Sequence, residues 1–129
     1  MLDAAGDDAL VIASRRMPGS EVERSRSRKL VTAAYAWLTD AALGLGVRDA
    51  QCGCKILSRR VRDEVLPAVA DDGFFFDTEL LARAKASGFR IVEVPVRWTE
   101  RRTGRGSSVR ILRTSLEFLR KLSMLRRDL

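Results

Sequence analysis

The hydrophobic and polar positions of the chain predict strands that alternate with helices. Residues 9–14 form an unbroken apolar run, which is typical of a strand covered on both faces of a parallel sheet. Residues 89–98 alternate between apolar and polar over most of their length, which predicts a strand with one exposed face. Pro95 places this strand at an edge or a bulge, and a further short strand is expected after Cys54. The pattern favours an α/β fold.

Apolar residues three or four positions apart predict the helices of the chain. The expected spans are residues 30–45, 59–69, 78–87 and 109–129. Gly44 and Gly46 are expected to end the first helix, and Pro67 to break or kink the second. The apolar side expected for the last helix consists of Ile111, Leu112, Leu116, Leu119, Leu122 and Leu125. Its other side is basic, so the helix is predicted to be amphipathic.

Two stretches that lack this periodicity, residues 15–28 and 99–108, are predicted to be basic loops. The 129 residues carry 24 Lys and Arg against 17 Asp and Glu, a net charge of +7. The planar guanidinium of arginine is suited to binding phosphate. We therefore expect an anionic partner, which the charge alone leaves open between a phosphorylated small molecule, an anionic membrane surface and nucleic acid. The simpler alternative is that both loops are solvated charged segments.

Composition excludes several kinds of chemistry. There is no histidine, which removes the usual general base and the commonest metal ligand. Cys52 and Cys54 are too close together to favour a disulfide and too few for a zinc site, so we interpret them as reduced, packed thiols. No apolar run approaches the ~20 residues that span a membrane. The basic loops lack aromatic residues for base stacking, which argues against nucleic acid.

The segment Phe74-Phe75-Phe76-Asp77-Thr78-Glu79-Leu80-Leu81 has two interpretations. In the structural one, Asp77 or Thr78 caps a helix and Glu79 adds negative charge to its first turn. In the functional one, carboxylates held at the start of a helix beside an apolar wall act on a polar substrate. The segment alone does not decide between them.

The order of the segments decides in favour of function. A strand ending in Ser14-Arg15 is followed by Val47-Arg48-Asp49-Ala50-Gln51-Cys52-Gly53-Cys54-Lys55 and then by Phe76-Asp77-Thr78-Glu79-Leu80-Leu81. Next come Ile91-Val92-Glu93-Val94-Pro95-Val96-Arg97-Trp98 and Gly106-Ser107-Ser108-Val109. Over essentially all 129 residues this resembles the C-terminal half of family 2 glycosyltransferases that load sugars onto polyprenyl phosphates. The likeness is greatest to the dolichyl-phosphate β-glucosyltransferases and their bacterial relatives.

The resemblance implies a partial GT-A fold, with a mixed, mostly parallel sheet flanked by helices and the N-terminal nucleotide-binding half missing. Residues 1–108 would be the acceptor-side half of this domain, and residues 109–129 a C-terminal basic amphipathic helix. The implied reaction is inverting transfer of a sugar, glucose above all, from a UDP- or GDP-sugar to a polyprenyl or dolichyl phosphate. Two departures from the family pattern are Ser108, where lysine is common, and Cys54, where phenylalanine is common.

The family's metal-binding Asp-x-Asp motif lies in the upstream half, so Mg or Mn is expected for the complete enzyme, with ligands that are not in this chain. We accordingly expect the chain alone to be inactive and to have a missing N-terminal half as a possible partner. The resemblance also implies a cytoplasmic protein, peripheral at the inner face of the membrane. A second hypothesis is a non-catalytic basic module that binds an anionic membrane surface or nucleic acid.

The resemblance implies roles for individual residues. Asp77 would orient the acceptor or stabilise the anomeric centre, with base catalysis second, and Glu79 would be a further catalytic candidate. A lipid phosphate has a second pKa of about 6 and is already a nucleophile at neutral pH, so it needs a general base less than a hydroxyl does. Asp49 and Gln51 would contact the sugar or shape its pocket. The residues implied for the acceptor phosphate or the leaving diphosphate are Arg15, Arg24, Arg26, Arg105, Ser107 and Arg110.

Overall fold

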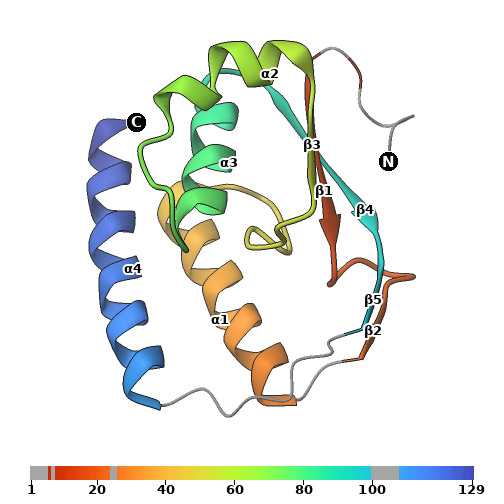
Figure 1. Cartoon of the computed structure of the whole chain (residues 1–129), viewed down its shortest axis with the longest axis vertical. Coiled ribbons are helices and arrows are strands. Elements are labelled where there is room, and N and C mark those ends of the chain that lie inside the picture. Colours follow the sequence, from red (N-terminus) through yellow and green to blue (C-terminus); the bar gives the residue numbers. More distant parts are fainter. Residues whose placement is uncertain (1–5, 7, 24–25, 100–107) are drawn as a thin grey trace.

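The structure is a computed structural model that describes residues 6, 8–23, 26–99 and 108–129, without the side chains of residues 23, 27, 28 and 108–113 (Figure 1). Its strands are β1 (Ala9–Ser14), β2 (Glu21–Glu23), β3 (Lys55–Leu57), β4 (Arg90–Pro95) and β5 (Arg97–Thr99). Its helices are α1 (Arg26–Leu43), α2 (Arg59–Glu64), the 3-10 helix η2 (Leu66–Ala68), α3 (Phe76–Ala86) and α4 (Ser108–Asp128).

The main sheet is mixed and has the order β3-β1-β4. The central strand β1 is buried along its whole length, which confirms the covered strand predicted from its apolar run. It pairs antiparallel with β3 and parallel with β4, so that Ile12 lies opposite both Lys55 and Glu93. Among the described strands β4 is at an edge, as Pro95 predicted. The single strand predicted over residues 89–98 is however divided: β4 ends at Pro95, and β5 belongs to another sheet. Because β1 and β3 are antiparallel, the carboxyl end of β1 lies beside the start of β3, at the same end of the strands.

A second, two-stranded sheet pairs β5 with β2, which lies in a segment that was predicted to be a loop. Glu21 pairs with Arg97 and Val22 with Trp98, in parallel register. The prediction of a continuous loop over residues 15–28 was wrong for β2 and for the start of α1. A three-residue strand is too short to show a period, and β2 exists because β5 offers it hydrogen bonds.

The helices lie on one side of the main sheet. Figure 1 shows α4 farthest from the sheet, with α1 and α3 between them. Leu10 and Ile12 of β1 meet Leu80 and Leu81 of α3 in one core, which Phe118 of α4 also joins. The Phe118 ring packs edge-to-face against Tyr35 and Phe75. Because α4 shares this core, it is packed against the elements that precede it.

Glycine and proline end the helices where the sequence predicted. Gly44, at a φ of 59°, follows α1, and its N–H donates to the Asp40 carbonyl at 2.7 Å. Pro67 lies in η2, which continues α2 as a tighter turn. The start of α3 differs from the prediction: Phe75 is the N-cap and no side chain caps the helix, so neither Asp77 nor Thr78 has this role. The helix begins at Phe76.

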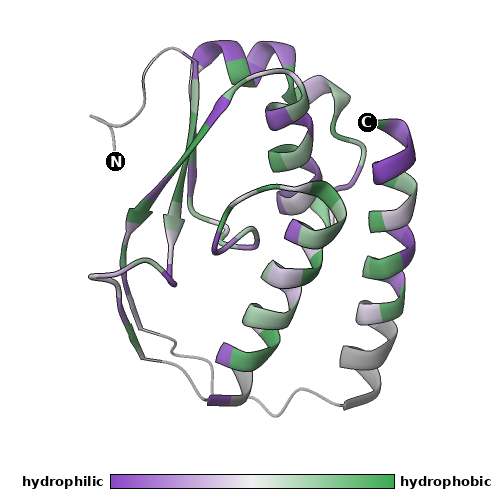
Figure 2. Ribbon diagram, turned by 180° about the vertical axis from the view of Figure 1, so that it is seen from behind, coloured by the Kyte–Doolittle hydropathy of each residue, from purple (hydrophilic) through white to green (hydrophobic). Residues whose placement is uncertain are grey.

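The buried side of α4 also differs from the prediction. Phe118, Leu122 and Leu125, at spacings of four and three residues, face the core. Leu116 and Leu119, predicted to belong to the apolar side, are 69% and 45% exposed. The helix is turned so that its one aromatic ring enters the aromatic cluster, which moves these two leucines toward solvent. Figure 2 shows hydrophobic and hydrophilic residues mixed along α4. No described helix is both long and apolar enough to cross a membrane.

Candidate functional site

Three of the predicted site residues, Arg15, Asp49 and Asp77, lie at the end of the sheet where β1 ends. Arg15 directly follows β1, and Lys55 begins β3 at the same edge. The loop between α1 and β3, which contains Asp49, lies against Arg15. Asp77, in the first turn of α3, lies against Lys55. Open α/β sheets bind their ligands outside the carboxyl ends of parallel strands, which makes this edge the candidate site.

Asp49 and Arg15 form the most buried ion pair of the site. Arg15 Nε donates to Asp49 Oδ2 at 2.6 Å, and Arg15 Nη2 donates to Asp49 Oδ1 at 2.7 Å. The backbone N–H of Arg15 also donates to Asp49 Oδ2, at 3.1 Å. The Asp49 side chain is fully buried and that of Arg15 is 13% exposed. The carboxylate therefore fixes the guanidinium in place, and Asp49 shapes the site from beneath its surface.

Glu93 of β4 holds the loop that carries Asp49. Both of its carboxylate oxygens accept the backbone N–H of Arg48, each at 3.0 Å. One of them also accepts the backbone N–H of Asp49, at 3.2 Å. Arg16, which follows β1, also contacts this loop: its Nη1 donates to the Arg48 carbonyl oxygen at 3.1 Å. The loop is thereby tied both to the sheet and to the segment after β1.

A second ion pair joins the other end of this loop to α3. Lys55 Nζ donates to Asp77 Oδ1 at 2.7 Å and also to the Cys52 carbonyl oxygen. The Lys55 side chain is only 4% exposed, whereas that of Asp77 is 25% exposed. Among the described residues, Asp77 Oδ2 has no hydrogen-bond donor. One carboxylate oxygen is thus held by lysine, and the side chain as a whole is partly exposed.

Three buried polar atoms near these pairs lack a hydrogen-bond partner within the described part of the chain. They are Ser14 Oγ, Gln51 Nε2 and Thr78 Oγ1. Ser14 precedes Arg15, Gln51 lies two residues after Asp49, and Thr78 follows Asp77.

A pocket with a basic lining adjoins the first ion pair. Its charged and polar lining residues are Arg15, Arg16, Ser20, Lys29 and Thr32. The Arg15 guanidinium also lies 5.9 Å from the ring centre of Trp98, in cation–π contact. Guanidinium, ammonium and hydroxyl groups converging on one pocket suit an anion such as a phosphate.

Glu79 does not lie with Asp77. Its carboxylate accepts the backbone N–H groups of Ala70 and Asp71, at 3.2 and 2.9 Å, and pairs with Arg83 Nε at 2.7 Å. Burial raises the pKa of Glu79, but the hydrogen bonds from Asp71, Arg83 and Ala70 together hold it below its usual value. The Glu79 side chain is only 6% exposed, and both of its carboxylate oxygens are hydrogen-bonded. This geometry favours a role for Glu79 in holding the turn before α3.

The other predicted substrate-binding residues are placed less fully. Arg26 is the first residue of α1 and is exposed, outside the basic pocket. Arg24, Arg105 and Ser107 lie outside the described residues. Arg110 lies in α4, and its side chain is likewise not described. Within the described ranges, no group of three or more acidic or cysteine side chains is arranged to hold a metal ion.

The two cysteines lie in the loop between the ion pairs. Both are free thiols, in agreement with the prediction. Cys52 is buried as expected, whereas Cys54 is exposed, so the prediction of a packed thiol was wrong for Cys54. Burial raises the pKa of the Cys52 thiol, with a smaller increase from the Asp49 carboxylate. Raising the pKa keeps Cys52 neutral and poorly nucleophilic at neutral pH.

Several residues that complete the site had no role in the sequence-based predictions. Lys55 is the last residue of the Val47–Lys55 motif, but the sequence contains no sign that its side chain contacts Asp77, which is 22 positions away. Glu93 is a polar position in the alternating pattern of β4, which predicts an exposed side chain and gives no sign that it holds the loop before β3. Lys29 lies in α1, and only the packing of that helix beside Arg16 brings it to the pocket.

Comparison with known proteins gives a consistent set of relatives. The chain is 38% identical over 118 residues to polyprenol monophosphomannose synthase of Mycolicibacterium smegmatis, covering 85% of this chain and 44% of that protein. It is 38% identical over 94 residues to glycosyltransferase AglD of Haloferax volcanii, covering 73% of this chain and 15% of that protein. A dolichyl-phosphate beta-glucosyltransferase, ALG5C of Trichomonas vaginalis, is 32% identical over 101 residues, 77% of this chain and 30% of that protein.

The chain thus spans less than half the length of each of these relatives. No protein-family model matches the sequence. No solved structure matches it either.

Proposed function

We propose that this chain, a homologue of part of several polyprenyl- and dolichyl-phosphate glycosyltransferases, forms the acceptor side of an inverting glycosyltransferase. The observation that carries the proposal is the pairing of Arg15 with Asp49 and of Lys55 with Asp77 at one edge of the sheet. It supplies a fixed cation beside an anion pocket and a partly exposed carboxylate. The mixed α/β architecture fits a GT-A-like glycosyltransferase of family 2.

The proposed reaction joins a phosphate oxygen of the acceptor to the anomeric carbon of the sugar. The bond between that carbon and the leaving nucleoside diphosphate breaks, and the leaving group takes the electron pair. The phosphate oxygen is already charged at neutral pH, so the protein's task is to position it and to stabilise the oxocarbenium-like centre. Arg15, Arg16 and Lys29 would bind phosphate, and Asp77 would face the sugar or orient the acceptor.

The identity of the sugar is a finer part of the proposal. Glucose is favoured by the likeness of the motifs to dolichyl-phosphate glucosyltransferases, which several relatives are named as. Two other relatives are named for mannose. Since Asp49 is buried, the specificity of this side of the enzyme would depend on Gln51 and Asp77 rather than on direct contact with Asp49.

Donor binding and a divalent metal, Mg or Mn, are proposed for polypeptide outside these 129 residues. The described acidic residues do not fit a metal site, so no step of the proposed reaction on this chain is assigned to a metal. A lipid acceptor requires the protein to reach a bilayer, and we place it in the cytoplasm, peripheral at the inner face of the membrane.

The test is a transfer assay with radiolabelled UDP-glucose or GDP-mannose, magnesium and polyprenyl phosphate. The chain is assayed alone and together with a separately produced donor-binding half of a homologous glycosyltransferase. We expect no product from the chain alone and glucosylated lipid from the combination. Robust turnover by the chain alone contradicts the separate donor half, and a mannosylated product overturns the assignment of glucose.

A further inference from the structure

The two-stranded sheet of β2 and β5 is attached to the end of β1 that leads into Arg15 (Figure 1). The Ser20 hydroxyl, just before β2, donates to the Ser14 carbonyl oxygen at 2.7 Å and accepts the backbone N–H of Val96 at 3.1 Å. The backbone N–H of Glu21 donates to the Val96 carbonyl oxygen, also at 3.1 Å. The small sheet is therefore fixed both to the end of β1 and to the junction of β4 and β5.

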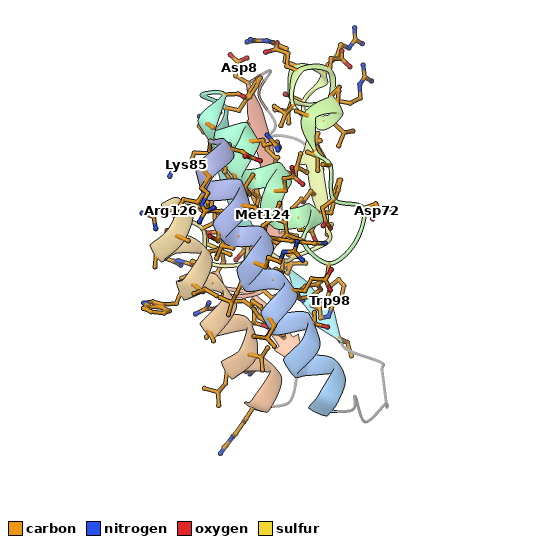
Figure 3. The ribbon with its side chains drawn as sticks, turned by 90° about the vertical axis from the view of Figure 1, so that its left-hand side faces the viewer. Asp8, Asp72, Lys85, Trp98, Met124 and Arg126 are labelled. Carbon is orange, nitrogen blue, oxygen red and sulfur yellow. The ribbon has the colours of Figure 1, made fainter. Side chains whose placement is uncertain are left out.

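The register of this sheet brings Trp98 to Arg15. Val22 of β2 pairs with Trp98 of β5, and Val22 also lines the basic pocket. Arg15 Cζ lies 5.9 Å from the centre of the Trp98 ring. Figure 3 shows Trp98 well away from Asp8, which precedes the start of β1, and so toward the end of the strands at which Arg15 lies.

Asp49 and Trp98 restrain the Arg15 guanidinium in two different ways. The Asp49 carboxylate accepts from Nε and Nη2, which fixes the guanidinium along one edge. An edge contact of this kind still lets the planar group tilt about the line through its two nitrogen atoms. An aromatic ring over the face of the group attracts the cation and opposes this tilt. Trp98 thus supplies a restraint that Asp49 does not.

We propose that Trp98 is a positioning residue of the basic pocket, whose ring fixes the plane of the Arg15 guanidinium so that it is oriented toward a bound phosphate. The inference rests on the proposed function and deepens it, because it gives phosphate binding a determinant that the sequence did not predict. The β2–β5 sheet is then the element that carries this determinant to the site.

Trp98 acts through Arg15 and not by its own contact with the phosphate. The face of an indole ring carries negative charge density, which attracts a guanidinium and repels an anion. An aliphatic side chain of similar size has no such face. The proposal therefore requires an aromatic ring at this position, and tryptophan is the strongest of the aromatic residues in cation–π contact.

The alternative is that Trp98 only helps to hold the β2–β5 sheet together. Trp98 is 39% exposed and lies outside the hydrophobic core, so its replacement should leave the core intact. In this alternative, leucine and phenylalanine would serve equally well in place of tryptophan. The two readings therefore differ in the order of the variants and not only in the size of the effect.

The experiment titrates the purified chain with inorganic phosphate at constant ionic strength and follows the Arg15 Nε–H signal in proton–nitrogen NMR spectra. Trp98→Leu should raise the dissociation constant about three- to fivefold, and Trp98→Phe should raise it less. Trp37→Leu, the same change at the other tryptophan of the chain, is the matched control and should leave the constant unchanged. The backbone amide signals of Val22 and Thr99 report whether the β2–β5 sheet is intact.

A larger loss of affinity in Trp98→Leu than in Trp98→Phe, with no loss in the control, supports the proposal. Unchanged affinity in Trp98→Leu, equal losses in both Trp98 variants, or an equal loss in Trp37→Leu overturns it. If Trp98→Leu loses the sheet signals, Trp98→Phe decides: weaker binding with the sheet intact supports the proposal, and unchanged binding overturns it.

The titration also separates this inference from the proposed function. Phosphate binding that is indifferent to Trp98 overturns the role of Trp98 alone and leaves the basic pocket as an anion site. Absence of phosphate binding by the unaltered chain overturns both the role of Trp98 and the assignment of the pocket to phosphate.

Discussion

The Arg15–Asp49 pair should contribute more to stability than any exposed ion pair of the protein. Replacing Asp49 by Asn keeps the shape of the side chain but removes its charge. The Arg15 guanidinium is 13% exposed and would be left with an amide in place of two carboxylate oxygens. Removing one partner of a buried pair costs about 3–5 kcal/mol, and the partial exposure of Arg15 favours the lower end.

The measurement is the free energy of unfolding in urea at pH 7. A loss of about 3 kcal/mol, at an m-value of about 2 kcal/mol/M, moves the midpoint down by about 1.5 M. The matched control is Glu21→Gln, which breaks the Arg97–Glu21 pair between side chains that are 81% and 68% exposed. An exposed pair contributes at most about 1 kcal/mol, so the control should scarcely change the midpoint.

The dependence on salt further distinguishes the buried Arg15–Asp49 pair from the exposed Arg97–Glu21 pair. Raising the ionic strength to about 1 M screens the exposed pair but affects a buried pair much less, so the loss in Asp49→Asn should persist. If Asp49→Asn loses no more than Glu21→Gln, the description of Asp49 as the residue that fixes Arg15 is wrong.

Three further predictions concern Asp77, Lys55 and Glu79. In an enzyme complete with its donor-binding half, Asp77→Asn should lower kcat by about 10²-fold, and a near-normal kcat would refute its role in the reaction. It should also lower stability, because the buried Lys55 ammonium loses its carboxylate partner. Lys55→Met should lower kcat with little change in KM and Lys55→Arg should restore part of it; an equal loss in both variants would indicate a purely structural lysine. Glu79→Gln should cost about 1–3 kcal/mol at pH 7 through its two backbone hydrogen bonds and Arg83. Because folding lowers the pKa of Glu79, its charge stabilises the protein above the unfolded pKa of about 4.3, and the cost of Glu79→Gln should shrink as the pH falls through the folded pKa.

The sequence predicted the elements whose signals are local. The apolar run of β1, the glycines after α1 and the proline in η2 each act within a few residues, and the structure confirms them. The grouping of Arg15, Asp49 and Asp77 at one site was also expected, but only from the resemblance to glycosyltransferases. No local period indicated that these residues would meet.

What the sequence missed depends on packing between distant segments. The strand β2 forms only because β5 lies beside it, and α4 is rotated by the fit of Phe118 among other rings. Glu79 shares a motif with Asp77, yet two residues along a helix turn a side chain by about 200°, so the two carboxylates face different neighbours. Lys55 and Glu93 became visible as site residues only through their contacts.

The most direct test of the acceptor-side assignment is the binding of a short, water-soluble polyprenyl phosphate to the chain by calorimetry. The matching polyprenyl alcohol and inorganic phosphate separate the contributions of the two ends of the ligand. The pocket variant is Arg16→Gln with Lys29→Gln, and Arg127→Gln, exposed at the end of α4, is the control. We predict binding that requires the phosphate, exceeds that of inorganic phosphate, and weakens about tenfold or more in the pocket variant, equivalent to about 1.4 kcal/mol. Equal affinity for the alcohol and the phosphate, or equal affinity in the pocket variant and the control, would contradict the account.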